Sequence, residues 1–208
     1  MDIQFYGANC VALSTGKVRV VVDDNLIDLG GKAVLKAGDI ALYTAAHSLP
    51  EQEVKMIING PGEFEASDVS VYGIPMRAHI DEEKQTNSTM YKIVANDIKV
   101  LVTGHIYPEI SESQLEAVGV VDVLIVPVGG NGYTLDPVGA TTLIKEIEPK
   151  LVIPVYYDDS TLKLPMPAQG LDQALQGLGM EPRERTAKLK VKSSDLGETV
   201  QLVVLEKV

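Results

Sequence analysis

Residues 40–50 read Ile-Ala-Leu-Tyr-Thr-Ala-Ala-His-Ser-Leu-Pro, which places an apolar run directly before a loop that carries a histidine. The run from Ile40 to Thr44 has the length and composition of a buried strand. The loop from Ala45 to Pro50 follows the carboxyl end of that strand. Because α/β proteins place functional groups in such loops, this is the first place in the chain to look for chemistry.

Short strands are predicted on both sides of this stretch. Apolar segments of four to eight residues alternate with turns rich in Gly, Asn and Ser, and no long helical pattern interrupts them. The first half of the chain is therefore predicted to be β-rich. The predicted strands are residues 3–6, 10–13, 18–22, 40–44, 56–58, 69–74, 89–94 and 98–103.

The second half of the chain changes to alternating strands and helices. Ser111 followed by acidic residues is typical of a helix N-cap, and Pro137 to Ile147 is predicted to be a helix with Pro in its first turn. A further helix is expected to end at Gly179. Continuous apolar runs predict strands buried on both faces. These runs are residues 121–126 and 151–155, and a last strand is predicted at 200–205.

Composition indicates one domain over residues 1–208 with a core of aliphatic side chains. The chain has 208 residues, of which 45% are hydrophobic, with no Trp and two Phe. A length of about 200–250 residues is ordinary for one α/β or β-rich domain. The core must therefore be filled by Val, Ile and Leu, and the β-branched residues among them favour sheets.

Charge and composition also exclude several classes of partner. The formal net charge of −11 repels phosphate backbones, so no nucleic-acid partner is expected. No uncharged apolar run reaches a membrane span and no secretory leader pattern opens the chain, so a cytoplasmic protein without a membrane partner is expected. The single Cys10 excludes an internal disulfide and a thiolate zinc motif. Any metal site must therefore use histidines and carboxylates.

Six segments in a specific order resemble the metallo-β-lactamase superfamily, in particular its predicted metal-dependent hydrolase branch, which includes ascorbate-phosphate-lactonase-like proteins. The resemblance implies an α/β fold, a four-layer αββα sandwich with a metal site at one edge. It covers nearly the whole chain. The segments are residues 5–10, 44–50, 60–65, 73–75, 126–130 and 148–154.

The metal-ligand loop of that family departs from its pattern in this chain. Members follow the strand with Thr-His-x-His-x-Asp-His, which falls here on residues 44–50. Only His47 is kept. Ala45 has no donor atom, Leu49 replaces a carboxylate, and Pro50 replaces an imidazole.

The other ligand positions implied by the resemblance are also changed. The bridging carboxylate falls on His105 and the terminal histidine on Tyr156. The family's middle histidine falls near His79, which lies one residue late, and a Gly-His pair near the start is Gly7-Ala8. The metal site is therefore expected to be eroded.

Two functions remain open from the sequence. The first is a non-catalytic pseudo-hydrolase without a cofactor, which binds a small molecule or a protein through a pocket that includes Tyr156, Asp158 and Asn131. The second is a divergent hydrolase of an ester, lactone or phosphoester. Its single zinc ion would be held by His47, His79 and His105, which leaves a position for water.

Overall fold

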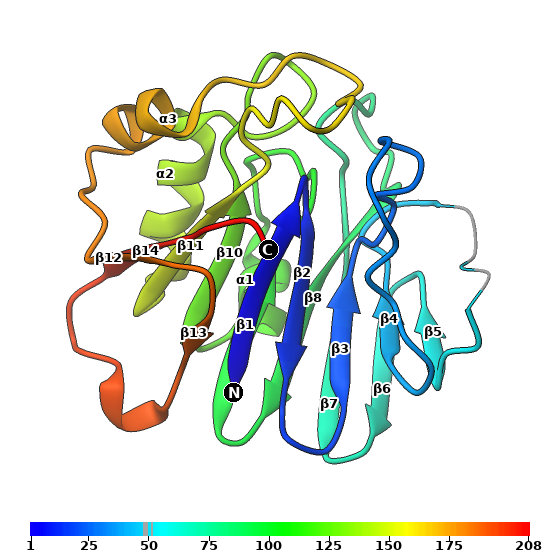
Figure 1. The fold of residues 1–208 in the computed structure, drawn as a ribbon. Coiled ribbons are helices and arrows are strands. Elements are labelled where there is room, and N and C mark those ends of the chain that lie inside the picture. Colours follow the sequence, from blue (N-terminus) through cyan, green and yellow to red (C-terminus); the bar gives the residue numbers. More distant parts are fainter. Residues whose placement is uncertain (48–49, 51) are drawn as a thin grey trace.

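Two β-sheets packed face to face form the centre of the molecule (Figure 1). The computed structural model describes residues 1–47, 50 and 52–208. One sheet has six strands in the order β13-β1-β2-β3-β4-β5, and the other has eight in the order β12-β14-β11-β10-β9-β8-β7-β6. The two mixed sheets implied by the sequence are therefore confirmed.

The six-stranded sheet comes mainly from the amino-terminal part of the chain. Strands β1, β2 and β3 pair antiparallel, β4 and β5 add in parallel, and β13 joins β1 antiparallel. Pairing in both directions makes this a mixed sheet. Its strands are β1 (Asp2–Gly7), β2 (Cys10–Ser14), β3 (Arg19–Val22), β4 (Ile40–Leu42), β5 (Met56–Ile58) and β13 (Leu189–Lys190).

The eight-stranded sheet begins as an antiparallel meander of β6 to β9 and continues in parallel through β10, β11, β14 and β12. The central parallel strands β10 and β11 are buried along their length, as their continuous apolar runs predict. The strands are β6 (Gly62–Ala66), β7 (Val69–Met76), β8 (Ser88–Ala95), β9 (Ile98–Val102), β10 (Val123–Pro127), β11 (Leu151–Val155), β12 (Glu184–Thr186) and β14 (Gln201–Leu205).

The main core lies between the sheets and is almost entirely aliphatic. Alternate residues of β1, Ile3 and Phe5, point into it and pack with residues of the opposite sheet such as Val100 and Ile153. All four are at most 2% exposed. At about 25 cal/mol per Å² of buried apolar surface, this layer supplies the main driving force for bringing the sheets together.

Three helices cover the outer face of the eight-stranded sheet, where a second apolar cluster lies. They are α1 (Glu112–Val118), α2 (Pro137–Ile147) and α3 (Leu171–Leu178), with a 3₁₀ turn at Ser193–Asp195. Ser111 caps α1 through a reciprocal capping box with Gln114. The helices predicted from the N-cap, Pro and Gly signals are therefore confirmed. Within the described residues, no helix has both the length and the apolar character that crossing a membrane requires.

The outer face of the six-stranded sheet is covered by irregular chain in the described part of the protein. Residues 23–39 fold over it, and Leu26, Leu29 and Leu35 pack on Val21 of the sheet. A carboxylate holds this segment in a loop, because Asp24 Oδ2 accepts the backbone N–H groups of Val34 and Leu35 at 2.7 Å each. The segment is rich in Asp and Gly, which favour turns, so this outer layer lacks helices.

The loops that follow β3, β4, β9, β10 and β11 gather along one edge of the sandwich (Figure 1). Parallel strands bring their carboxyl ends to the same edge of a sheet, and both sheets contribute such strands. Segments distant in sequence therefore meet here, at the edge where the resemblance placed a metal site.

Candidate functional site

A buried carboxylate fixes the start of the histidine loop. Thr44 lies two residues after the end of β4, and Asp23 lies directly after the neighbouring strand β3. The Thr44 backbone N–H donates to Asp23 Oδ1 at 2.7 Å, and the Thr44 hydroxyl donates to Asp23 Oδ2 at 2.6 Å. Both carboxylate oxygens are thus engaged. The pair positions the segment that leads to His47.

A glycine lets the loop after β9 approach this segment closely. Gly104 has φ +65°, and a Cβ atom at this position would lie 2.4 Å from Thr44 Oγ1. A side chain at Gly104 would therefore both strain the backbone and collide with Thr44. The close approach brings the next residue, His105, beside the histidine loop.

The two loops enclose a cavity of about 50 Å³. The His105 ring is wedged against two tyrosines, with ring-centroid distances of 4.4 Å to Tyr156 and 4.9 Å to Tyr133. His47 also faces the cavity, so two of the three predicted histidines share one wall. The lining residues are Ala8, Asn9, Asp23, Asn25, Leu29, Ala45, His47, His105, Tyr133, Tyr156 and Pro165.

His79 lies next to this cavity without lining it. Its backbone N–H donates to the His105 carbonyl at 2.7 Å, which joins the two loops. Its ring lies near Tyr107, with centroids 5.9 Å apart. The Nδ1 atoms of His79 and His105 are both buried without a protein hydrogen-bond partner. The three histidines are therefore neighbours, but they do not converge on one cavity.

Of the three predicted pocket residues, only Tyr156 lines the cavity. Asn131 is exposed, and its side-chain amide donates to the Pro167 carbonyl. Asp158 is also exposed, and its backbone N–H donates to Gln169 at 2.9 Å. The structure places both side chains in the surface loops beside the cavity.

Asn9 and Asn25, two polar residues that sequence reasoning missed, also line the cavity. Both side-chain polar atoms of Asn9, Oδ1 of Asn25 and the hydroxyl of Tyr156 are buried without a protein partner. Asn9 belongs to the segment 5–10 that carries part of the resemblance, which is the one signal that pointed to it. Buried polar groups of this kind normally bind ordered water or a ligand.

The donor set does not fit the zinc site that the resemblance implies. A catalytic zinc ion uses three protein ligands, usually imidazoles and carboxylates. Here Ala45 offers no donor, and both oxygens of Asp23 already bind Thr44. In the part of the chain that the structure describes, no three His, Cys, Asp or Glu residues are arranged to hold a metal ion. The three-His zinc site remains a prediction from the sequence.

Burial shifts the pKa of two ionisable groups that line the cavity, His105 and Asp23. Burial, with smaller contributions from His47 and His79, lowers the pKa of His105 to about 3. Burial also raises the pKa of Asp23, although hydrogen bonds from Thr44 oppose this. His105 is therefore a neutral imidazole at neutral pH.

Acidification should weaken the fold through His105. A histidine in the unfolded chain has a pKa of about 6.5, so below that pH the unfolded chain takes up a proton that folded His105 excludes until its pKa near 3. We expect the free energy of unfolding to fall by about 2 kcal/mol between pH 7 and pH 5, at about 1.4 kcal/mol per pH unit below the unfolded pKa. Urea unfolding at the two pH values measures the change.

His105→Phe is the matched variant for this test, because Phe keeps a flat ring between Tyr133 and Tyr156 but cannot take up a proton. Between pH 7 and pH 5, the free energy of unfolding of the variant should fall by about 2 kcal/mol less than that of the wild type. Contributions from the rest of the protein are common to both proteins and cancel in the comparison. Equal losses would show that His105 is protonated in the folded protein.

Comparison with known proteins finds a family model that covers most of the chain. The model for the beta-lactamase superfamily domain matches residues 2–156. No curated protein matches the sequence. The match includes the histidine loop, the Gly104-His105 turn and Tyr156, and so every residue that lines the cavity except Pro165.

Several solved structures share the fold. A proposed Zn-dependent hydrolase of the metallo-β-lactamase superfamily from Thermotoga maritima aligns with a TM-score of 0.76 and 22% identity, over 99% of this chain and 98% of that one. Igni18, a metallo hydrolase from Ignicoccus hospitalis, aligns with a TM-score of 0.62 and 16% identity, over 99% of this chain and 94% of that one. A proposed metal-dependent hydrolase from Parabacteroides distasonis aligns with a TM-score of 0.64 and 14% identity, over 98% of this chain and 93% of that one. These likenesses extend over nearly the full length of the three neighbours.

Proposed function

Because this chain belongs to the beta-lactamase superfamily domain family, we propose that it is a hydrolase-like protein whose catalytic metal site is lost and that it acts by binding a small molecule or a protein. The donor set of the cavity carries the proposal. At the family's ligand positions, Ala45 supplies no donor, and His105 and Tyr156 stand in place of a carboxylate and an imidazole. Membership of the family indicates the scaffold, whereas the side chains at the site determine which chemistry it can perform.

The size of the cavity supports the same conclusion. Sites that bind small organic molecules usually enclose about 300–1,000 Å³, whereas this cavity encloses about 50 Å³. That volume suits a few ordered water molecules, which would satisfy the unpaired atoms of Asn9, Asn25 and Tyr156. We therefore expect the former catalytic centre to be a hydrated polar cluster and the ligand to bind elsewhere on the scaffold.

One observation favours the alternative of a divergent hydrolase of an ester, lactone or phosphoester. His47 and His105 line the same cavity, and His105 is held in the neutral form that binds metals. With His79 as a third ligand, such a site would be the three-His centre predicted from the sequence. Metal content separates the two functions without a known substrate.

Wild-type protein, purified without a tag from cells grown with added zinc, should contain no zinc above background by plasma mass spectrometry. A His47→Ala/His105→Ala double variant is the matched control and should give the same value. A chelator should leave the melting temperature of the wild type unchanged, because no metal contributes to its stability. Nearly one zinc ion per wild-type chain, absent from the double variant, would instead establish the three-His hydrolase.

A further inference from the structure

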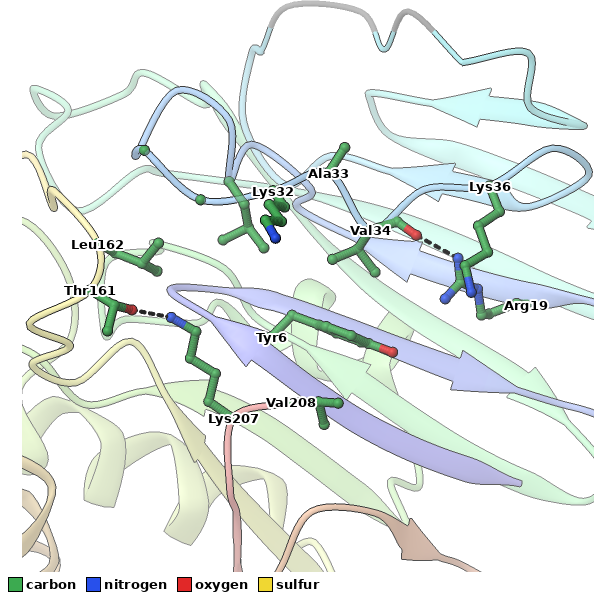
Figure 2. Close-up of a pocket in the computed structure, with 13 residues that line it drawn as sticks. Tyr6, Arg19, Lys32, Ala33, Val34, Lys36, Thr161, Leu162, Lys207 and Val208 are labelled. Carbon is green, nitrogen blue, oxygen red and sulfur yellow. Dashed lines mark hydrogen bonds between the residues drawn. The ribbon is translucent and has the colours of Figure 1, made fainter.

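A second, larger cavity lies on the outer face of the six-stranded sheet and encloses about 470 Å³ (Figure 2). This volume falls within the range of small-molecule sites. Five separate segments of the chain form its walls: strand β1, the start of β3, the loop of residues 23–39, the loop near Thr161 and the carboxyl-terminal residues 207–208. The lining residues are Tyr6, Arg19, Leu26, Gly30, Gly31, Lys32, Ala33, Val34, Lys36, Thr161, Leu162, Lys207 and Val208.

The interior of this cavity is mostly apolar. In Figure 2 the Tyr6 ring lies along the floor, with the loop of residues 32–36 above it. Leu26, Val34 and Leu162 add aliphatic side chains to the lining. An apolar ligand body would thus contact hydrocarbon and one aromatic ring, and burial of its surface would favour binding.

Two of the four basic residues in the lining are already neutralised. The Arg19 guanidinium donates to Asp39 Oδ2 and to the Val34 carbonyl, both at 2.6 Å. Lys207 Nζ lies 2.6 Å from Asp159 Oδ2. These pairs hold the walls in place. Arg19, with its planar donor group engaged, is not available for a ligand.

Lys32 and Lys36 supply the unbalanced charge. Both are exposed at the rim, and among the described residues neither forms an ion pair. No carboxylate side chain lines the cavity. Set against the terminal carboxylate of Val208, which also lines the cavity, these two lysines leave an excess of one positive charge in a protein whose formal net charge is −11. A local charge of the sign opposite to that of the whole protein favours an anionic ligand.

We propose that this cavity binds an amphipathic organic anion, with an apolar body placed on Tyr6 and a carboxylate head at the rim that carries Lys32 and Lys36. A carboxylate without an apolar body would leave the hydrocarbon walls in contact with water. A neutral apolar molecule would gain nothing from the two ammonium groups. The site is separate from the histidine cavity and does not depend on whether that cavity holds metal.

Octanoate is a suitable probe, with octanamide as a neutral probe of equal chain length. Both are titrated against anilinonaphthalene sulfonate, a fluorescent amphipathic anion, bound to the wild-type protein in the presence of a chelator. We expect octanoate to displace the dye at a concentration about tenfold lower than octanamide, because each exposed ammonium group adds a few-fold in affinity. Inorganic phosphate should not displace it.

Two variants locate the binding. Lys32→Gln/Lys36→Gln should weaken octanoate about tenfold and leave octanamide unchanged. Ala33→Phe should remove binding of both, because the new ring fills space at the lining. Lys145→Gln, which changes an exposed lysine on α2, should behave as wild type. Melting curves establish that each variant is folded.

The proposal is overturned if octanoate and octanamide compete equally, because the lysines then contribute nothing. Displacement by inorganic phosphate as strong as by octanoate would overturn the role of the apolar body. Binding that survives in a folded Ala33→Phe variant would place the ligand elsewhere. The Lys32→Gln/Lys36→Gln variant changes only exposed side chains, so it decides the proposal even if Ala33→Phe fails to fold.

Discussion

Ala45→His should create a three-histidine zinc site in the histidine cavity. Ala45, His47 and His105 line the same cavity, so the substitution supplies a third imidazole beside the two that are present. Three protein ligands with an open fourth position are sufficient for zinc. We expect about one zinc ion per chain by plasma mass spectrometry.

Zinc binding to Ala45→His should also stabilise the fold. A ligand at about 100 times its dissociation constant adds about 2.7 kcal/mol. For a domain of this size, that raises the melting temperature by about 5–10 °C. A chelator should reverse the increase, and calorimetric melting curves with and without zinc measure it.

The matched control is Ala45→Gln, which adds a polar side chain of similar reach that is a poor zinc ligand. The Ala45→Gln variant should take up no zinc. Ala45→His combined with His47→Ala should lose most of the zinc binding and of the zinc-dependent rise in melting temperature. Absence of zinc from a folded Ala45→His variant would mean that the loop after β4 does not hold residue 45 beside the other two histidines. That result would contradict the cavity geometry, whereas the wild-type metal content tests the proposed function.

Gly129→Ala should destabilise the protein by about 3 kcal/mol, at the upper end of the cost of overpacking a tight contact. A Cβ at Gly129 would lie 2.3 Å from the Tyr156 carbonyl oxygen and 3.0 Å from Ala168 Cβ. The first contact is with backbone, so a change of side-chain rotamer cannot relieve it. The ends of β10 and β11 would have to separate, and Tyr156 would move in the histidine cavity. Urea unfolding of the variant measures the loss.

Gly60→Ala is the control for this substitution. No atom lies within 4 Å of a Cβ at Gly60, and its backbone φ is not in the positive range. The same chemical change should therefore alter the free energy of unfolding by less than about 1 kcal/mol. Similar losses in the two variants would show that the close packing of Gly129 on Tyr156 is absent in solution.

Most of the fold could be predicted from the sequence because its signals are local. The strands at residues 40–42, 98–102 and 151–155 are apolar runs bounded by turn residues, and the helix of residues 137–147 begins with an Asp cap and a Pro. Strands β6, β12 and β13 were missed. Strand β6 is an edge strand whose glutamates are exposed, and β12 and β13 are only three and two residues long, so none of them has a buried run that gives a clear pattern.

The site could be predicted only in part. The absence of a donor atom at Ala45 holds in any conformation, because it is a property of the residue. Whether His79 lines the same cavity as His47 and His105 depends on how three loops pack, and sequence spacing does not report this. The hydrogen bond from the His79 backbone N–H to the His105 carbonyl depends on tertiary packing alone.

By itself, the sequence determined the order of most strands and helices, the aliphatic core, and which residues stand at the ligand positions that the resemblance implies. These follow from side-chain chemistry and from periodicity within single elements. Only the tertiary structure decided that His105 is buried between two tyrosines, that Asn131 and Asp158 lie outside the cavity, and that Tyr6 and Lys36 share a second cavity. Such contacts join segments far apart in the chain, and their geometry is set by the packing of the two sheets and the loops at their edges.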